Sequence, residues 1–124
     1  MQFKEAVVSK RVVSLRAEAQ DAAAVLGVQI RTARHERGWT AKRLAAAIYV
    51  SERTVLALES GSGRTAIGTV FNAAAVLGVP LFGAEDRAEL ARMRRRGEDR
   101  LALIGQRVRV PELTEEQVAQ LSDF

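Results

Sequence analysis

Two short segments, residues 41–48 and 52–60, constrain the fold of this chain more than any other part of its sequence. Thr40 and Ser51 stand directly before them, and hydroxyl side chains in that position cap the N-termini of helices. Apolar residues recur at helical spacing in both segments, namely Leu44, Ala45, Ile48, Val55 and Leu58. Helices this short are not stable alone. We therefore predict that they cross steeply, bury small residues against each other and leave the start of the second helix projecting from the surface.

Other segments predict further helices on both sides of this pair. Ser14 precedes a helical pattern over residues 15–36, which Gly38 ends, and residues 66–77 carry the clearest amphipathic spacing in the chain. Four weaker patterns follow: a short extended segment over residues 79–82, a helix over 86–96 that 98–104 could continue, a strand-like alternation over 106–110, and a capping box, Thr114-x-x-Gln117, that opens a last short helix.

These patterns predict an all-α protein with one compact core. Four parts are expected: an N-terminal extension over residues 1–21, a helical domain over 22–82, a C-terminal helix over 83–105 and a tail over 106–124. The short extended segment before residue 83 is either the edge of the core or a small strand at a dimer interface.

The composition excludes several classes of function. The 124 residues contain no Cys and a single His, His35, so we expect no metal centre. No Gly-rich phosphate loop or nucleophile motif is present, so we expect neither a cofactor nor an enzyme. No secretory signal and no apolar run of membrane-spanning length is present, so we expect no membrane association and a cytoplasmic location.

Charge is distributed unevenly along the chain. Residues 1–109 hold all 19 basic side chains and 11 of the 15 acidic ones, whereas residues 110–124 hold the other four acidic residues and no basic one. A basic body attracts polyanions, and an acidic tail repels them. Because a projecting helix end fits the major groove of DNA, the sequence predicts a double-stranded DNA partner.

The run GWTAKRLAAAIYVSERTVLALESG, residues 38–61, resembles the phage Cro and repressor (Xre-type) helix-turn-helix family. The resemblance extends over about residues 24–82 and implies a five-helix, lambda-repressor-like DNA-binding domain with short tails. It implies that Arg34 pairs with Glu59 as a structural clamp. The residues that it implies as DNA contacts are Thr40, Lys42, Arg43, Ser51, Glu52, Arg53, Thr54, Leu56, Ala57, Arg64 and Thr65.

Within this set the resemblance implies different roles. Thr40 and Ser51 would contact phosphates, Arg53 would bind guanine with two hydrogen bonds, and Glu52 would accept a hydrogen bond from cytosine. Arg64 and Thr65 would touch the opposite phosphate backbone, and Ala57 stands where the family reads bases.

Three departures from the family pattern affect these expectations. Ala41 stands where the family often has Gln, which removes one usual phosphate contact. Tyr49 stands where Gly usually allows a left-handed turn, so either the turn is rebuilt or Tyr49 points outward as a contact of its own. Leu56 and Ala57 make the exposed face of the second helix of the pair apolar. Either these side chains contact thymine methyl groups, or this helix reads bases only weakly.

A narrower resemblance, to the HipB-type antitoxins, lies in three short motifs: Gly38-Trp-Thr followed by Leu-Ala, TAIGTVF from residue 65, and LALIGQRVR from residue 101 with a terminal Asp-Phe. It implies an autoregulating repressor that binds a palindromic operator as a homodimer and also binds a HipA-like kinase toxin. The implied partner or dimer residues are Val79, Leu81, Phe82, Val108, Val110 and Phe124.

Less specific interpretations are also consistent with the sequence. The chain could be a stand-alone Xre-type repressor without a toxin partner, or a protein-interaction adaptor that no longer binds DNA. The arginines at positions 92 and 94–96 form either a solvated helix face or a phosphate-binding patch.

Overall fold

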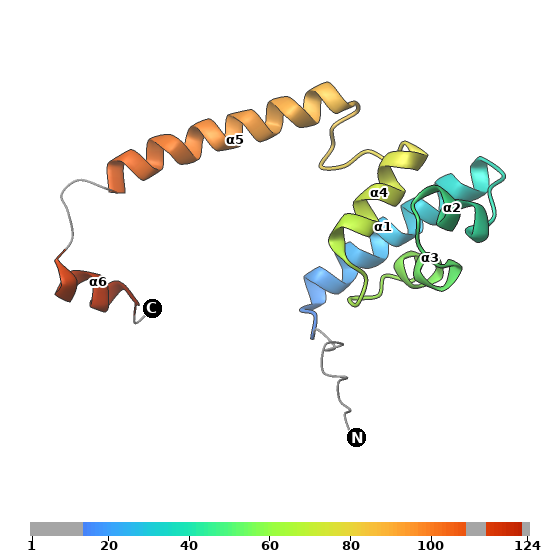
Figure 1. The fold of residues 1–124 in the computed structure, drawn as a ribbon, viewed down its shortest axis with the longest axis horizontal. Helices are drawn as coiled ribbons and strands as arrows, with labels where there is room; N and C mark the ends of the chain where they lie inside the picture. Colours follow the sequence, from blue (N-terminus) through green and yellow to red (C-terminus); the bar gives the residue numbers. More distant parts are fainter. Residues whose placement is uncertain (1–13, 109–113, 123–124) are drawn as a thin grey trace, which may run out of the picture. The chain divides into compact units, whose positions relative to one another are not determined.

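The computed structural model describes residues 14–108 and 114–122, and the regular secondary structure in these ranges is helical (Figure 1). In chain order the helices are α1 (Ala17–Glu36), α2 (Ala41–Ala47), α3 (Glu52–Glu59), α4 (Ile67–Leu77), α5 (Arg87–Val108) and α6 (Glu115–Ser122). The described ranges contain no β-strand, only isolated bridge residues at positions 81 and 84. The all-α fold predicted from the sequence is therefore confirmed.

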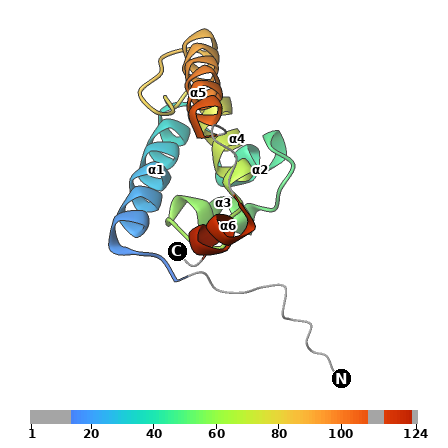
Figure 2. The same cartoon turned by 90° about the vertical axis from the view of Figure 1, so that its left-hand side faces the viewer.

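The chain divides into two compact units, residues 1–83 and 84–124. The first unit contains α1 to α4, and α2, α3 and α4 are grouped on one side of α1 (Figure 2). The fifth helix of the expected domain, α5, belongs to the second unit together with α6.

The core of the first unit is built from small and branched aliphatic side chains. Ile30 of α1, Leu44 of α2 and Val55 of α3 are the largest fully buried side chains, and Ala73 and Ala74 of α4 are also fully buried. Burying side chains of this size contributes about 1.5–3 kcal/mol each relative to leaving them exposed. The short helices α2 and α3 persist because they share this core with α1 and α4.

The helix boundaries follow the predicted caps at α2 and α3 but not at α1. The hydroxyls of Thr40 and Ser51 accept hydrogen bonds from the backbone N–H groups of Arg43 and Thr54, at 3.0 and 3.1 Å. Ser14 does not cap α1, which begins at Ala17 after Arg16 and has no side-chain cap. The first turn of α1 is exposed, whereas Leu15 before it is partly buried and lies against Gly63 in the loop before α4.

Gly27 sets how closely α1 approaches α3. It is buried, and a Cβ atom at this position would lie 2.5 Å from the carbonyl oxygen of Glu59 and 2.7 Å from that of Leu58. Both neighbours are backbone atoms near the end of α3, which cannot move aside as a flexible side chain would. The backbones of the two helices are therefore in direct contact here.

In the second unit, α5 runs without interruption through Gly97 to Val108. The strand predicted over residues 106–110 is therefore wrong for 106–108, which are helical, and Val110 lies outside the described residues. The predicted capping box of α6 is present, since Thr114 N–H donates to Gln117 Oε1 at 2.9 Å and Gln117 N–H donates to Thr114 Oγ1 at 3.2 Å.

The contact at Gly27 generates a stability prediction. We expect Gly27→Ala to lower the free energy of unfolding by about 1–3 kcal/mol, because the added methyl group overpacks a rigid backbone contact. Gly68→Ala is the matched control, since a Cβ there meets no atom within 4 Å and Ala is the better helix former. Urea denaturation of both variants measures the difference, and equal stability of the two would contradict the tight contact.

Candidate nucleic-acid interface

A buried ion pair joins α1 to the end of α3. Arg34 donates from Nε to Glu59 Oε2 at 2.6 Å and from Nη2 to Glu59 Oε1 at 3.0 Å, while its Nη1 donates to the backbone carbonyl of Trp39 at 2.9 Å. Arg34 is 6% exposed and Glu59 7%. The structure thus brings together the two residues that the sequence resemblance paired as a clamp.

The hydrogen bonds within this ion pair offset the free-energy cost of burying two charged side chains. The hydrogen bond to Glu59 raises the pKa of Arg34 above its ordinary value against the opposing effect of burial, and the negative charge of Glu59 adds to the rise. The guanidinium therefore stays charged at any ordinary pH. Two parallel N–H···O bonds fix the relative orientation of the two side chains as well as their distance. The clamp holds the end of α3 on α1.

Trp39, in the turn between α1 and α2, supports two arginines. The guanidinium carbon of Arg43 lies 4.6 Å from the centre of its ring and that of Arg37 lies 5.6 Å from it, both within the range of a cation–π interaction. Arg37 also donates to the backbone carbonyl of Val76 at 3.1 Å. Trp39 thus orients Arg43, one of the predicted DNA contacts, at the start of α2.

The amino end of α3 is open to solvent. Ser51, Glu52 and Arg53 are exposed, and Leu56, one turn further on, is 52% exposed. Thr54 and Ala57 are partly buried, and the Thr54 hydroxyl lies 3.0 Å from that of Ser51. The amino-terminal half of α3 therefore exposes one carboxylate, Glu52, one guanidinium, Arg53, and one apolar side chain, Leu56.

The turn between α2 and α3 keeps its left-handed residue although that residue is not glycine. Tyr49 has φ 60° and is 94% exposed. The turn is therefore not rebuilt, and of the two alternatives for Tyr49 the outward one is observed. A side chain in this conformation costs roughly 1 kcal/mol relative to glycine.

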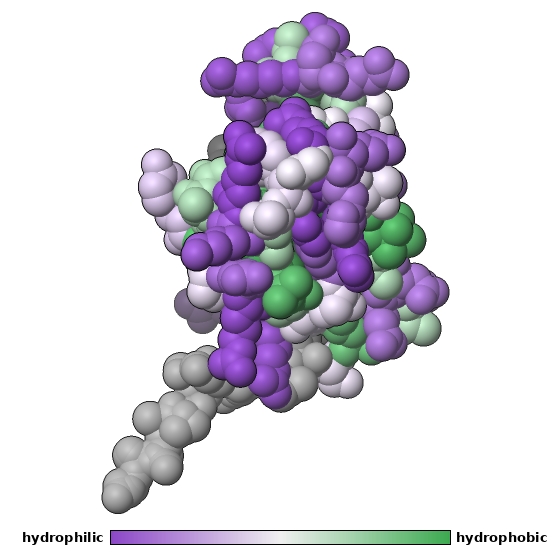
Figure 3. All heavy atoms as spheres, turned by 90° about the vertical axis from the view of Figure 1, so that its right-hand side faces the viewer, coloured by the Kyte–Doolittle hydropathy of each residue, from purple (hydrophilic) through white to green (hydrophobic). Residues whose placement is uncertain are grey.

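The remaining predicted contacts flank α3 on both sides in sequence. Thr40, Lys42 and Arg43 are exposed at the start of α2, whereas Ala41 is buried and faces the core. In the loop before α4, Arg64 is exposed and Thr65 is partly buried. The side of the molecule that carries α2 and α3 is covered mainly by hydrophilic side chains with small apolar patches (Figure 3).

The residues predicted as partner or dimer contacts are dispersed. Val79 is buried in the core and Leu81 packs against it, while Phe82 is 72% exposed and lies edge-on to Phe71 with ring centroids 5.9 Å apart. Val108 is the last residue of α5. Val110 and Phe124 lie outside the described residues.

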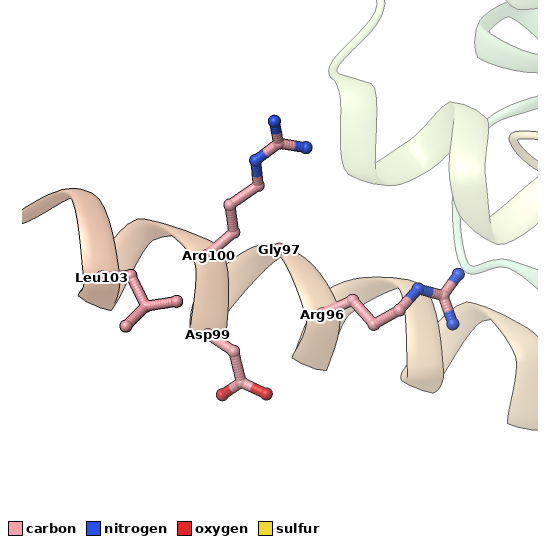
Figure 4. Close-up of a pocket in the computed structure, with 5 residues that line it drawn as sticks. All are labelled: Arg96, Gly97, Asp99, Arg100 and Leu103. Atoms are coloured by element: carbon pink, nitrogen blue, oxygen red, sulfur yellow. The ribbon is translucent and has the colours of Figure 1, made fainter.

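The described residues were also searched for a ligand pocket, a metal site and a membrane-spanning helix. A shallow hollow on α5 is lined by Arg96, Gly97, Asp99, Arg100 and Leu103, but all five residues belong to one exposed helix, along which their side chains fan out, and no second element lines the hollow (Figure 4). In the described ranges no cluster of His, Asp and Glu could hold a metal ion, and no helix is long and apolar enough to cross a membrane.

Two features in and behind the interface were not predicted from the sequence. One is the contact between the Trp39 ring and the Arg43 guanidinium, which no sequence pattern around these two residues indicates. The other is Gly27, whose signal was available, because a glycine inside a helical pattern usually has a packing reason.

Two crossed, capped helices, the second held by a buried clamp and open at its amino end, define a helix-turn-helix domain. Residues 30–83 match the protein-family model described as Helix-turn-helix. This match supports the Xre/Cro-CI-type family and a DNA-binding transcription regulator. A comparison with curated proteins finds no match to this sequence.

The turn at Tyr49 generates the second prediction. We expect Tyr49→Gly to raise the free energy of unfolding by about 1 kcal/mol, because glycine relieves the left-handed strain and the exposed ring contributes no core packing. Tyr49→Ala is the control, since it removes the ring but keeps a Cβ atom in the strained conformation. Thermal denaturation compares them, and a Tyr49→Gly protein no more stable than Tyr49→Ala would contradict the strain.

Proposed function

We propose that this protein is a sequence-specific transcriptional repressor that inserts the amino end of α3 into the major groove of duplex DNA. The observation that carries the proposal is the solvent-exposed start of α3, with Glu52, Arg53 and Leu56 facing outward while Glu59 at the other end is locked to Arg34. A helix held rigidly at its inner end and free at its outer end suits base reading.

The proposed base contacts follow from side-chain chemistry. Arg53 donates two hydrogen bonds to guanine O6 and N7, and Glu52 accepts one from cytosine N4. Leu56, with the partly buried Ala57 beside it, contacts thymine methyl groups. The apolar part of this surface therefore favours A·T pairs next to the G·C pair that Arg53 reads.

The proposed phosphate contacts lie on both sides of α3. The cap residues Thr40 and Ser51 accept N–H bonds, and Thr40 keeps its hydroxyl hydrogen as a donor. The hydroxyls of Ser51 and Thr54 are hydrogen-bonded to each other, so this pair keeps one hydroxyl hydrogen as a donor to phosphate. Lys42 and Arg43 supply positive charge at the start of α2, and Arg43 is oriented by Trp39. Arg64 and Thr65 contact the other side of the groove.

A homodimer on a palindromic operator completes this proposal. One α3 helix reads a half-site of only a few base pairs, and a twofold axis repeats that reading about one helical turn, roughly 34–36 Å, further along the duplex. The proposed place of action is the cytoplasm.

Arg53 provides the test of base reading. We expect Arg53→Ala to weaken binding to the preferred operator by about 1–3 kcal/mol and to relax sequence preference, with a smaller effect on random DNA. Lys42→Ala is the control, because loss of a phosphate contact weakens all duplexes by a similar factor and lowers the salt dependence. Fluorescence anisotropy with operator and random duplexes measures both. Equal losses of Arg53→Ala on the two duplexes would remove the base-reading role.

A finer proposal adds the role of antitoxin to that of repressor. The resemblance of residues 38–45, 65–78 and 101–109 to HipB-type antitoxins supports a HipA-like kinase as a second partner, and the acidic region around α6 is a candidate for its contact. A reading frame for such a kinase beside this gene would support this role. Without one, a stand-alone Xre-type repressor is the better description.

Truncation separates the two roles. We expect removal of residues 110–124 to leave operator affinity unchanged within about twofold, because these residues contain no basic side chain to contact phosphates. The same truncation weakens the complex with a co-expressed kinase partner. Unchanged kinase affinity would exclude the tail from that contact. A full-length protein with no operator preference and a shallow salt dependence would instead favour the adaptor.

A further inference from the structure

Helix α5 carries a row of arginines on one face. Arg92, Arg96 and Arg100 follow one another at intervals of four residues, so they start about 6 Å apart along the same side of the helix. All three are exposed, and within residues 14–108 and 114–122 none of their side chains makes an ion pair or a hydrogen bond. We call these three residues the α5 arginine row. Arg107 follows Arg100 after seven residues, or about two further turns.

The acidic residues of α5 do not neutralise this row. The helix contains seven arginines and three acidic residues, Glu89, Glu98 and Asp99, which gives it a net charge of +4. Glu89 accepts a hydrogen bond from a backbone N–H at the start of the helix, at 2.9 Å. Both carboxylate oxygens of Glu98 accept from Arg94 at 3.1 Å. Asp99 is the remaining acidic residue, and Figure 4 shows its side chain extending away from that of Arg100.

The spacing within the row differs from that of a face that only keeps a helix soluble. Opposite charges four residues apart stabilise a helix, as in the pair of Arg94 and Glu98, whereas like charges at this spacing repel. The α5 arginine row places two like-charged pairs in succession along one face. An anionic partner that lies along this face would remove the repulsion.

The chemistry of α5 indicates which anion fits. Every basic residue of the helix is an arginine, and a guanidinium can donate two parallel hydrogen bonds to one phosphate. Duplex DNA carries one negative charge per about 1.7 Å of its axis, so a row about 12 Å long faces several phosphates at once. The helix contains no aromatic residue on which the bases of a single strand could stack. These features favour the phosphate backbone of a duplex.

We propose that the α5 arginine row is a second DNA contact, which binds the phosphate backbone of duplex DNA and reads no bases. The inference rests on the proposed function for its partner, duplex DNA, but it uses none of the residues assigned to α2, α3 or the loop before α4. Phosphate contacts do not depend on sequence. The row therefore raises the affinity for operator and random DNA by the same factor.

Two pairs of arginines on α5 allow a matched test in the full chain. Arg96→Gln/Arg100→Gln removes two charges from the row, and Arg87→Gln/Arg94→Gln removes two charges from the opposite side of the same helix. We expect the row variant to bind a random duplex about tenfold or more weakly at about 0.1 M salt, because two phosphate contacts are lost. The control variant should bind almost as tightly as the wild type.

The salt dependence counts the lost contacts. Each phosphate contact contributes about 0.9 to the slope of log K against log salt concentration, so the row variant should have a slope smaller by about 2. Its preference for operator over random DNA should be unchanged. Fluorescence anisotropy over a range of salt concentrations measures both quantities, with circular dichroism to check that helix content is kept.

A second test locates the bound DNA on the helix. The chain contains no Cys, so Leu103→Cys and Leu101→Cys each introduce a single thiol. Both leucines are exposed, at 61% and 68%. Leu103 lines the same hollow as Arg96 and Arg100, whereas Leu101 starts from nearly the opposite side of the helix. A random duplex should slow alkylation of the thiol at position 103 several-fold and leave that at position 101 unchanged.

Three results would overturn the inference: equal losses of affinity in the two arginine variants, a row variant that binds like the wild type, or DNA protection at position 101 instead of 103. Protection at position 103 by poly-glutamate but not by DNA would also overturn it, because the row would then fit an acidic protein.

The same measurements separate this inference from the base-reading proposal. If the row variant loses affinity while the wild type shows no operator preference and Arg53→Ala has no effect, base reading fails and the row stands. If operator preference and the effect of Arg53→Ala hold while the row variant binds like the wild type, only the row fails. A chain that binds no duplex refutes both.

Discussion

The contact between Arg34 and Glu59 is the constraint on which the orientation of α3 depends. An eight-residue helix has too few internal hydrogen bonds to be stable alone, so its direction is set by what holds its ends. At one end the buried carboxylate receives two hydrogen bonds from Arg34, which also binds the carbonyl of Trp39. Removing either partner would leave a buried charge unpaired, a change that typically costs about 3–5 kcal/mol.

The same junction links the clamp to the charged surface of α2. Arg34 fixes the backbone of Trp39, and the ring of Trp39 lies under the guanidinium of Arg43. The position of one proposed phosphate contact is therefore set by the residue that also anchors the recognition helix. Basic side chains that are pre-oriented lose less conformational entropy when they meet a phosphate backbone.

Much of this could be predicted from the sequence because the signals are local or carried by a family pattern. Thr40 and Ser51 cap the helices that they precede, and the resemblance paired Arg34 with Glu59. The predictions that did not hold concern weaker signals. Ser14 resembles a cap, but α1 begins only at Ala17, and its first turn is exposed. The alternation over 106–108 occurs at the end of a long helix, and adding residues to an existing helix requires less free energy than starting a new element.

Other features were beyond the reach of local patterns. The contact at Gly27 involves the backbone of residues more than thirty positions away, and no periodicity reports such a distance. The division between residues 83 and 84 likewise depends on which helices pack together, although the predicted boundary lay next to it. Which exposed side chain meets which base depends on the DNA as well as on the protein, and local patterns in the protein sequence carry no information about the DNA.

The tight approach at Gly27 also separates two properties of α3 that could otherwise change together. Its tilt is set from the inner face, by backbone atoms near Leu58 and Glu59, while the side chains that would discriminate bases stand on the outer face. Substitutions at the outer positions can then alter operator choice without moving the helix. A lineage carrying this junction could acquire new regulatory targets while its scaffold stays unchanged.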